Sequence, residues 1–311
     1  MIKSKKLVKN KKSVLERRSG GAKIVFGIFF VAFAIYSVTL LYPLFWMILN
    51  SVREVTDYNI AIATKKAFSL DIVFDFSNYA RVATVIGNTR FSYLDMVFNS
   101  LWTTTISAFL AIFMSSICGY CLSKYEFKLK GILYGIAIVK MILPIVGSDG
   151  AALQFYGATG LFDTPWYLIL GGLGGLGGMQ FLIMYGFFKN VHWAYAEAVF
   201  IDGGNDFTAF FRVMLPQAFS MMFLFFIMNF MGGWNEYMTY LIYMPSYTTL
   251  ATGMYLVSNT LERTGQMPMY YAGLVLSMIP ILSLFIAFSN QILTQVKRTY
   301  LSVKSTFTIP R

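Results

Sequence analysis

Residues 24–49 read IVFGIFFVAFAIYSVTLLYPLFWMIL, an apolar run that only isolated small polar residues interrupt. A helix needs about 20 apolar residues to cross the ~30 Å hydrocarbon core of a bilayer. The apolar part of a cleaved signal peptide has only ~7–15 residues and leads to a small-residue cleavage site, which this run lacks. The run therefore predicts an uncleaved first membrane span.

The composition of the 311-residue chain places the rest of it in the membrane as well. Hydrophobic residues make up 57% and charged residues 13%, with a mean hydropathy of +0.61. Soluble domains carry about 25% charged residues, and disordered chains combine low hydrophobicity with high charge, so both classes are excluded. Six apolar blocks occur, at residues 24–49, 97–122, 131–147, 166–188, 218–242 and 269–293. The sequence thus predicts an all-α integral membrane protein with six transmembrane helices.

Lysine and arginine are unevenly distributed over the segments that flank these blocks. Of the 25 in the chain, 18 lie in 1–23, 123–130, 189–217 and 294–311, and six lie in 50–95, 148–165 and 243–268. Cytoplasmic loops carry the excess of these residues, so we expect both termini in the cytoplasm. A basic segment 1–23 and a tail 294–311 then flank a membrane domain over 24–293. This topology accounts for the net charge of +11 without a nucleic-acid partner.

The outer segment 50–95 is expected to hold a short amphipathic helix in its second half, from Asn78 to Asp95. A glycine-rich tract, GGLGGLGG at 171–178, lies inside the fourth block. It satisfies the dinucleotide pattern G-x-G-x-x-G, but that pattern requires a parallel sheet around it. Its pairs Gly171/Gly175 and Gly174/Gly178 have instead the spacing that lets a neighbouring helix approach. We predict close helix packing there, in a helix soft enough to bend.

Residues for covalent chemistry are scarce in this chain. No P-loop pattern occurs, so the chain itself is not a P-loop ATPase. The only histidine, His192, stands beside Trp193 at an expected membrane edge, so no histidine triad or metal cluster is expected. Cys118 and Cys121 form C-x-x-C at the end of an apolar block, and we interpret them as ordinary membrane-helix cysteines. We therefore expect no enzyme, no metal site and no cofactor in this chain.

The cytoplasmic segment 189–217 reads KNVHWAYAEAVFIDGGNDFTAFFRVMLPQ. Residues 193–201 have helical composition, a Gly-Gly pair follows, and the apolar spacing of 207–214 predicts a second short helix. Pro216 suits the first turn of the fifth span, where its missing N–H costs nothing. The result is a helix–turn–helix with one apolar side and with Glu197, Asp202, Asp206 and Arg212 as its charges. From the residues alone, a hairpin on lipid headgroups and a docking site for a cytoplasmic partner are equally supported.

The same segment resembles the EAA loop of binding-protein-dependent ABC importer permeases. That pattern is Glu-Ala-Ala, three residues, Gly, nine residues, Ile, one residue and Leu-Pro. The chain matches its spacing with Glu197, Ala198, Val199, Gly203, Val213, Leu215 and Pro216, where the two valines are apolar replacements. Asp202-Gly203-Gly204 also resembles the Asp-Gly-Ala common in these loops.

Further stretches resemble the sugar-importing subgroup, in particular maltose-transporter-type permeases with six spans. They are 160–164, 186–189, 233–236, Asn78-Tyr79 and Asn99-Ser100, so the likeness covers about residues 24–293. It implies the type I ABC importer permease fold in a bacterial cell membrane. It also implies a second homologous permease, a cytoplasmic ATPase dimer that binds ATP and Mg²⁺, an extracytoplasmic solute-binding protein and a carbohydrate substrate. The EAA residues would couple this subunit to the ATPase.

Four polar residues within the apolar blocks are candidates for the substrate path. Lys140 lies about ten residues into the third block, and a lysine at mid-membrane costs ~2.5–3.5 kcal/mol unless it faces the bundle or a wet cavity. Asn229, Asn235 and Glu236 lie along the fifth block, Glu236 near its outer end. For each of them, a structural role and a path-lining role both remain open.

Two other classes of function compete with an importer subunit. An ion-coupled secondary transporter needs paired intramembrane charges and often an inverted repeat, for which Lys140 and Glu236 alone are thin support. A membrane-embedded enzyme needs a convergent cluster of His, Cys or acidic residues, and the sequence has none.

Overall fold

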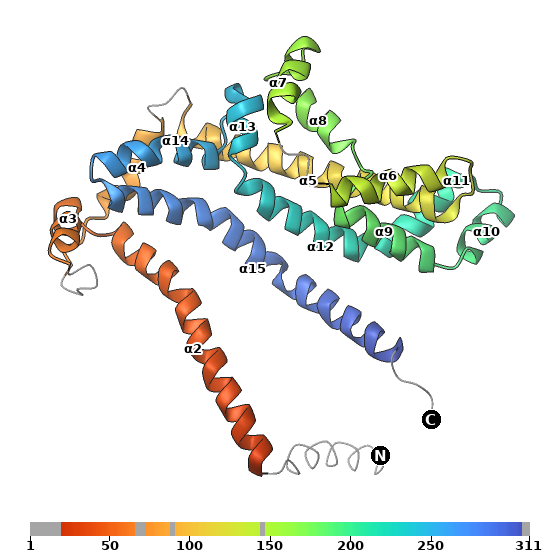
Figure 1. The fold of residues 1–311 in the computed structure, drawn as a ribbon, viewed down its shortest axis with the longest axis horizontal. Helices are drawn as coiled ribbons and strands as arrows, with labels where there is room; N and C mark the ends of the chain where they lie inside the picture. Colours follow the sequence, from red (N-terminus) through yellow and green to blue (C-terminus); the bar gives the residue numbers. More distant parts are fainter. Residues whose placement is uncertain (1–19, 66–71, 88–90, 144–146, 307–311) are drawn as a thin grey trace.

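The structure is a computed structural model that describes residues 20–65, 72–87, 91–143 and 147–306. The predicted cytoplasmic segment 1–23 thus lies almost wholly outside the described residues, as does the end of the tail. Within the described part, every regular element is helical apart from one isolated bridge between Arg53 and Phe74. Figure 1 shows helices packed around α5, with α2 and the end of α15 leaving the bundle. The all-helical prediction is confirmed.

Four helices are long and apolar enough to cross a membrane, as judged by length and composition among the described residues. They lie in α2 (Gly20–Ser51), in α5 (Tyr93–Lys124), in the continuous helix Asp206–Trp234, and in α15 (Met267–Thr306). The third apolar block forms α6 (Lys130–Ile142), which has 13 residues. The fourth block was predicted as one helix and is instead two, α8 (Trp166–Gly172) and α9 (Gly178–Asn190).

The break between α8 and α9 has a local cause. Gly177 has a φ of +135° and Gly178 a φ of +75°, backbone conformations that L side chains rarely adopt. Glycine in a helix interior also costs ~0.5–1 kcal/mol relative to alanine, so six glycines within eight residues weaken the helix along this whole stretch. The sequence predicted a helix that bends at this tract. The structure shows that the helix is interrupted there completely.

The central helix α5 is held closely against α9. A Cβ atom at Gly119 of α5 would lie 2.9 Å from the backbone N of Tyr185 in α9. Ser92 caps α5 in a capping box, where its hydroxyl accepts from the Asp95 N–H and the Asp95 carboxylate accepts from the Ser92 N–H. The backbones of α5 and α9 thus lie in close contact at Gly119, and the later helices pack on this pair.

One end of the bundle, the α4 end, is built from the short helices α3 (Val55–Ala63), α4 (Ser77–Gly87) and α14 (Leu250–Arg263), while α7 (Asp149–Ala158) and α13 (Met238–Tyr243), which η2 (Pro245–Tyr247) follows, lie above the middle of the molecule in Figure 1. The helix expected in 78–95 is α4. Asn78, fully buried, donates to the carbonyls of Ser51 and Arg53 at 3.1 and 2.8 Å. Ser100 accepts from the Leu250 N–H at 2.8 Å. Buried backbone groups at this end are thus paired by side chains from distant segments.

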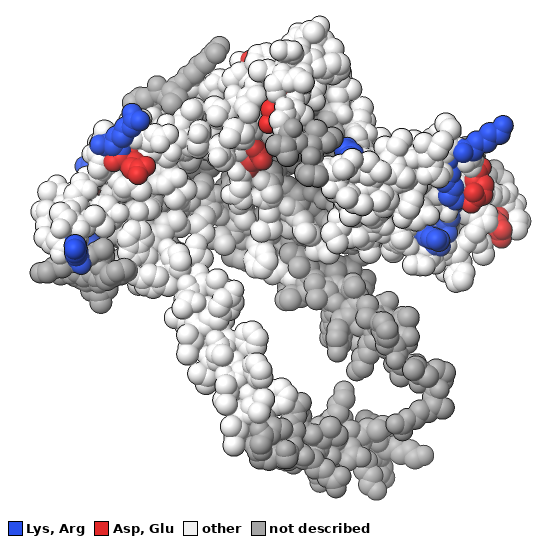
Figure 2. Space-filling view, in the orientation of Figure 1, with Lys and Arg blue, Asp and Glu red and all other residues white. Residues whose placement is uncertain are grey.

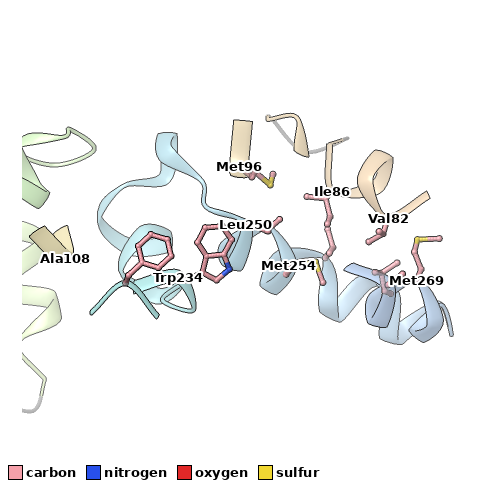
Figure 3. Packing of buried hydrophobic residues seen from close by; sticks show 12 residues of the cluster. Val82, Ile86, Met96, Ala108, Trp234, Leu250, Met254 and Met269 are labelled. Carbon is pink, nitrogen blue, oxygen red and sulfur yellow. The ribbon is translucent and has the colours of Figure 1, made fainter. Parts of the chain in front are cut away.

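A hydrophobic cluster lies beneath these short helices. It joins α4, α5, α12, α14 and α15, and eight of its twelve residues are labelled in Figure 3: Val82, Ile86, Met96, Ala108, Trp234, Leu250, Met254 and Met269. A Cβ at Gly273 of α15 would meet Met254 Cε at 2.7 Å, so α15 approaches α14 closely here.

The outer faces of the helices are apolar. In Figure 2 charged side chains gather at the left and right ends of the molecule, with a smaller group along its upper middle, whereas the part of α2 drawn in white carries none. The long apolar side chains of α2 are exposed from Ile24 onward, Phe30 by 74%. Lipid tails accept such a surface at no cost, whereas a soluble protein rarely exposes one. The surface therefore suits a membrane protein.

Candidate functional site

Residues 194–214 form a helical hairpin at the end of the bundle opposite the α4 end, here called the α10 end (Figure 1). Its elements are α10 (Ala194–Ile201), α11 (Asp206–Thr208) and the π-helical turn η1 (Ala209–Met214). Asn205 caps the second arm, because its Oδ1 accepts from the Thr208 N–H at 2.9 Å. The predicted helix–turn–helix is confirmed.

The turn of this hairpin depends on two glycines for different reasons. Gly203 has a φ of +80°, and its N–H donates to Phe200 O at 3.1 Å, while the Gly204 N–H donates to Val199 O at 2.8 Å. Together these bonds make a Schellman motif, which satisfies carbonyls that a helix end leaves unpaired. A Cβ at Gly204 would lie 2.5 Å from Val199 Cγ1 and 2.9 Å from Val199 O. Gly203 is needed for its positive φ, and Gly204 is needed because a side chain there would clash with Val199.

The second arm does not end before Pro216, as the sequence had suggested. The helix runs without interruption from Asp206 to Trp234, and Pro216 lies inside it, directly after the π turn. A proline inside an α-helix removes one hydrogen bond and clashes with the carbonyl four residues earlier. A wider π turn at that point changes the register of the carbonyls, and such turns are frequent at functional sites. The hairpin is therefore mechanically continuous with α12 (Leu215–Trp234).

The inner face of the hairpin packs on aromatic rings of α5 and α9. The Phe210 ring centroid lies 4.8 Å from that of Tyr120, and Tyr120 lies 5.5 Å from Phe188. Ala196 of α10 and Ala209 of η1 are fully buried against this cluster. Aromatic pairs of this kind contribute ~0.5–1.5 kcal/mol each beyond the area they bury. The hairpin is thus fixed to the bundle through its apolar side.

Tyr125, just past the end of α5, adds a polar bond. Its hydroxyl donates to Asp206 Oδ1 at 2.7 Å, and its ring lies 5.9 Å from that of Trp193, edge to face. Burial, with the hydrogen bonds of the Tyr125 hydroxyl, raises the pKa of Tyr125 above its ordinary value of 10, so the phenol stays protonated as a donor. Lys124 Nζ donates to Val191 O at the start of the hairpin. Both arms are therefore connected to the end of α5.

The opposite face of the hairpin is open. Glu197, Ala198, Asp202 and Arg212 are exposed, and none of their side chains makes a hydrogen bond or ion pair within the described part of the chain. Between these charges, Ile201 is 85% exposed. Of the remaining EAA residues, Leu215 is half-buried and Pro216 is exposed. The structure thus places five of the predicted coupling residues on the hairpin and the other two, Leu215 and Pro216, at the start of α12. The side chains of Glu197 and Asp202 have no partner within the described part of the chain.

A groove of about 470 Å³ runs beside the hairpin, between its second arm and the end of α5. Its walls are almost entirely apolar and include Tyr120, Phe127 and Phe207, with Asp206 as the one acidic residue. Phe207 is 75% exposed. An apolar groove thus lies beside the exposed charges of the hairpin, and protein interfaces likewise combine an apolar core with a polar rim.

The four intramembrane candidates do not meet in one site. Lys140 lies over the break between α8 and α9: its Nζ is 3.5 Å from Leu176 O, and a Cβ at Gly177 would meet its Cδ at 2.8 Å. Its side chain is exposed on the surface of the described part rather than enclosed in the bundle. The aliphatic part of Lys140 thus occupies space that the glycine leaves, and its ammonium group approaches a carbonyl that the broken helix leaves without a partner.

Asn229 has a partner that the sequence did not suggest. Its side chain and that of Gln180 exchange two hydrogen bonds, of 2.5 and 3.1 Å, between α12 and α9. Such amide pairs between helices in a membrane contribute about 1 kcal/mol or less. Lys140 and Asn229 therefore lie near the same break, each engaged by protein groups.

Asn235 and Glu236 lie at the far end of α12, toward the α4 end. Asn235 is its C-cap and donates to Met231 O at 2.9 Å, and the Glu236 carboxylate accepts from the Thr239 N–H at 3.0 Å at the start of α13. Both are exposed. Their hydrogen bonds are those of helix ends, and only Asn235 also lines a pocket, together with three tyrosines that no sequence pattern singled out.

Two further patterns of the sequence concern the metal-ligating side chains and the glycine tract. Among the described residues, no group of three His, Cys, Asp or Glu side chains comes together. The glycine tract is flanked by helices that pack on α5, not by strands. Close approach of this tract to α5 is made by Gly172 and Gly175, whose Cβ atoms would lie 2.7 Å from Leu110 Cβ and 2.5 Å from Met114 C. A Cβ at Gly171 or Gly178 would meet nothing within 4 Å, and one at Gly174 would meet only Gly171 O, so the predicted packing pairs were wrong except for Gly175.

Comparison with known proteins identifies a family. The sequence profile of the family described as binding-protein-dependent transport system inner membrane component matches residues 107–299. The diacetylchitobiose uptake system permease protein of Streptomyces coelicolor is 23% identical over 271 residues, 85% of each chain. The arabinooligosaccharides transport system permease protein of Bacillus subtilis is 25% identical, over 83% of this chain and 89% of its own length.

A maltodextrin transport system permease protein from Streptococcus pneumoniae is 24% identical, covering 80% of this chain and 85% of its own. Among solved structures, a chain of a bacterial ABC transporter involved in the import of the acidic polysaccharide alginate superposes with a TM-score of 0.69. It covers 88% of this chain and 98% of its own length, at 19% sequence identity. At that identity the likeness establishes the fold.

Proposed function

Because the chain belongs to the family of binding-protein-dependent transport system inner membrane components, we propose that it forms half of the translocation path of an ATP-driven importer for a sugar or oligosaccharide. It is a transport subunit and not an enzyme. The curated relatives named above are permeases for oligosaccharides, which supports a carbohydrate substrate. The second half of the path is a homologous permease, and a solute-binding protein delivers the substrate from outside.

The proposed topology has six spans in a bacterial cell membrane, with α6 as the third and the broken pair α8–α9 as the fourth. Both termini and the α10 end then lie in the cytoplasm, and the α4 end lies outside. Supporting this, Lys124, Lys130 and Lys189 all lie at the α10 end, at helix termini that the basic bias assigns to the cytoplasm. A broken helix within a membrane is tolerated where protein groups satisfy its backbone, as Lys140 does at Leu176.

Cysteine labelling tests this topology. A cysteine at Lys65 is expected to react with an impermeant thiol reagent added to intact cells, and a cysteine at Gly20 only after the membrane is opened. Cys118 and Cys121 are first replaced by alanine so that they do not contribute signal. The reverse pattern would overturn the topology and the cytoplasmic placement of the hairpin.

The observation that carries the coupling proposal is the two-sided hairpin. Its inner side packs on α5 and α9 and continues into α12, and its outer side presents unpaired Glu197 and Asp202 beside exposed apolar residues. In the proposed mechanism the hairpin lies in a groove of the cytoplasmic ATPase, which holds the ATP and Mg²⁺. Movement of that ATPase on ATP binding is transmitted through the continuous helix to the path. This chain contributes a rigid connection rather than a chemical step.

Glu197→Arg tests the coupling role, because Glu197 is exposed and bonds to no group in the described part of the chain. The variant is expected to insert and to pair with the second permease normally, while ATP hydrolysis stimulated by the binding protein and sugar uptake fall together by about tenfold or more, which corresponds to ~1.4 kcal/mol of lost docking energy. Gly203→Pro, which removes the N–H bonded to Phe200, is expected to have the same effect.

The matched control is Glu126→Arg, the same charge reversal at an exposed position of the α10 end outside residues 189–217, which is expected to leave hydrolysis unchanged. Normal membrane abundance with normal stimulated hydrolysis in Glu197→Arg would contradict the coupling role. It would favour a hairpin that only rests on headgroups. An ion-coupled transporter is not proposed, because Lys140 and Asn229 are engaged by neighbouring helices rather than paired with intramembrane charges.

A further inference from the structure

A small pocket of about 190 Å³ lies between the end of α12, α14 and α15, toward the α4 end. It is smaller than the ~300–1,000 Å³ cavities that enclose whole drug-sized ligands, so it suits one ring of a larger molecule. Its lining mixes aromatic and polar side chains: Trp234, Asn235, Tyr237, Tyr255, Ser258, Tyr270 and Ser277 are among them. This balance distinguishes it from the apolar grooves at the α10 end.

The aromatic wall of this pocket is pre-arranged. The rings of Tyr237 and Tyr255 are stacked, with centroids 4.4 Å apart and an interplanar angle of 22°. Tyr255 is 38% exposed and Tyr237 is half-buried, so the stack presents an accessible aromatic surface. The indole of Trp234 is fixed by its N–H bond to Ser277 O at 3.1 Å.

Several polar side chains that line this pocket still have donors or acceptors that no neighbouring group uses within the described part of the chain. No group in the described part of the chain bonds to the phenol hydroxyls of Tyr237, Tyr255 and Tyr270. Ser258 and Ser277 donate to carbonyls of their own helices, at 2.7 Å in each case, which leaves the lone pairs of both hydroxyls available as acceptors. Asn235 donates a side-chain N–H to Met231 O, and no group in the described part of the chain bonds to its Oδ1.

From this combination we propose that the pocket is a subsite for one sugar ring on the outer part of the translocation path, with Tyr255 as its stacking platform. A pyranose has an apolar face of C–H groups, which packs on an aromatic ring, and a rim of hydroxyls, which needs donors and acceptors. The donors and acceptors for these hydroxyls come from Tyr237, Tyr270, Ser258 and Asn235. The subsite rests on the proposed function, since it takes the substrate that the binding protein releases and holds it until the path opens inward.

The test uses the whole transporter in liposomes with its binding protein and ATPase. Labelled maltotriose, diacetylchitobiose and arabinotriose are the probes, and the ratio of sugar imported to ATP hydrolysed is measured. Tyr255→Ala is expected to lower this ratio by roughly threefold to tenfold, the factor expected for the loss of one aromatic contact. Stimulated ATP hydrolysis stays normal, because the hairpin is untouched. Tyr255→Phe, which keeps the ring, is expected to retain most of the ratio.

Leu256→Ala is the control, because Leu256 is 45% exposed on the same helix and does not line the pocket. A second measurement places a cysteine at Tyr255, with Cys118 and Cys121 replaced by alanine. We expect an external impermeant maleimide to label it and the imported sugar to protect it. If the wild-type transporter imports none of the three sugars, the proposed carbohydrate function fails. If it imports one and Tyr255→Ala keeps the normal ratio, or the cysteine is unlabelled or unprotected, only the subsite is overturned.

Discussion

The turn at Gly203–Gly204 and the break at residues 173–177 both interrupt a helix with glycines. The geometry of the turn is set by residues close in the chain, and that of the break by a distant helix. At the turn, both constraints are local: a φ of +80° at Gly203 and a contact of Gly204 with Val199, five residues earlier. At the break, Gly175 is pressed against Met114 of α5, sixty-one positions away in the chain.

This difference separates two uses of glycine. The turn reverses the chain direction within one hairpin, and its hydrogen bonds close within six residues. The break allows two helices to pack backbone to backbone, and its unpaired carbonyl at Leu176 is approached by Lys140 from a third helix. A substitution at the turn is therefore expected to alter the hairpin alone, whereas one at the break should disturb the bundle.

The largest effect is expected for Gly175→Ala. The new Cβ would lie 2.5 Å from Met114 C and 2.7 Å from Met114 O, which are backbone atoms that cannot rotate away. Overpacking of this kind costs ~1–3 kcal/mol or more, so the melting temperature of the purified complex should fall by several degrees. Gly171→Ala is the control, because its Cβ meets nothing within 4 Å. Equal melting temperatures would show that the break after α8 does not approach α5 in this way.

A smaller and more local effect is expected for Gly204→Ala. Its Cβ would meet Val199 Cγ1 at 2.5 Å, which a side-chain rotation relieves in part, and Val199 O at 2.9 Å, which it does not. We expect the complex to assemble with nearly normal melting temperature and to lose stimulated ATP hydrolysis as the turn opens. Gly204→Ala with Val199→Ala removes the side-chain clash and should recover part of the activity. If the double variant recovers no activity, the clash of the new Cβ with Val199 O accounts for the whole effect.

At Gly203 the expected effect depends on the backbone rather than on space. A Cβ at this position would meet nothing, but alanine at a φ of +80° costs ~1–2 kcal/mol. Asparagine tolerates this region better. We therefore expect stimulated hydrolysis to be highest in the wild type, intermediate in Gly203→Asn and lowest in Gly203→Ala. A ranking set by side-chain size alone would contradict the left-handed conformation of this turn.

The smallest effect is expected for Tyr125→Phe, which removes the bond to Asp206 and keeps the ring against Trp193. A single hydrogen bond of this kind contributes ~0.5–1.5 kcal/mol, less where water competes. The raised pKa of Tyr125 means that the folded state holds its proton more tightly than the unfolded state. Its stabilising contribution is thus complete below a pH of about 10 and is lost as the pH rises through the folded pKa. The difference in melting temperature between Tyr125→Phe and the wild type should therefore be smaller at high pH than at neutral pH.

The sequence anticipated the hairpin well because the determinants are close together in the chain. Gly203 ends one helix, the apolar spacing of 207–214 defines the next, and the spacing from Glu197 to Pro216 identifies the family. It failed at Pro216, whose effect on the helix depends on a π turn that has no sequence signature. It failed at the fourth apolar block for a related reason: hydropathy reports that residues 166–188 suit a membrane, but not that their helix is broken.

By itself, then, the sequence determined the class of protein, the helical content, the family and the turn of the hairpin, since composition, apolar periodicity and local backbone preference are properties of short segments. Only the tertiary structure decided which glycines touch a neighbouring helix, that Asn229 pairs with Gln180, and that Tyr237 stacks on Tyr255 at the end of α12. These contacts join residues that are brought together by the packing of separate helices. Side-chain shape and helix position select them jointly, and neither is encoded in a single segment.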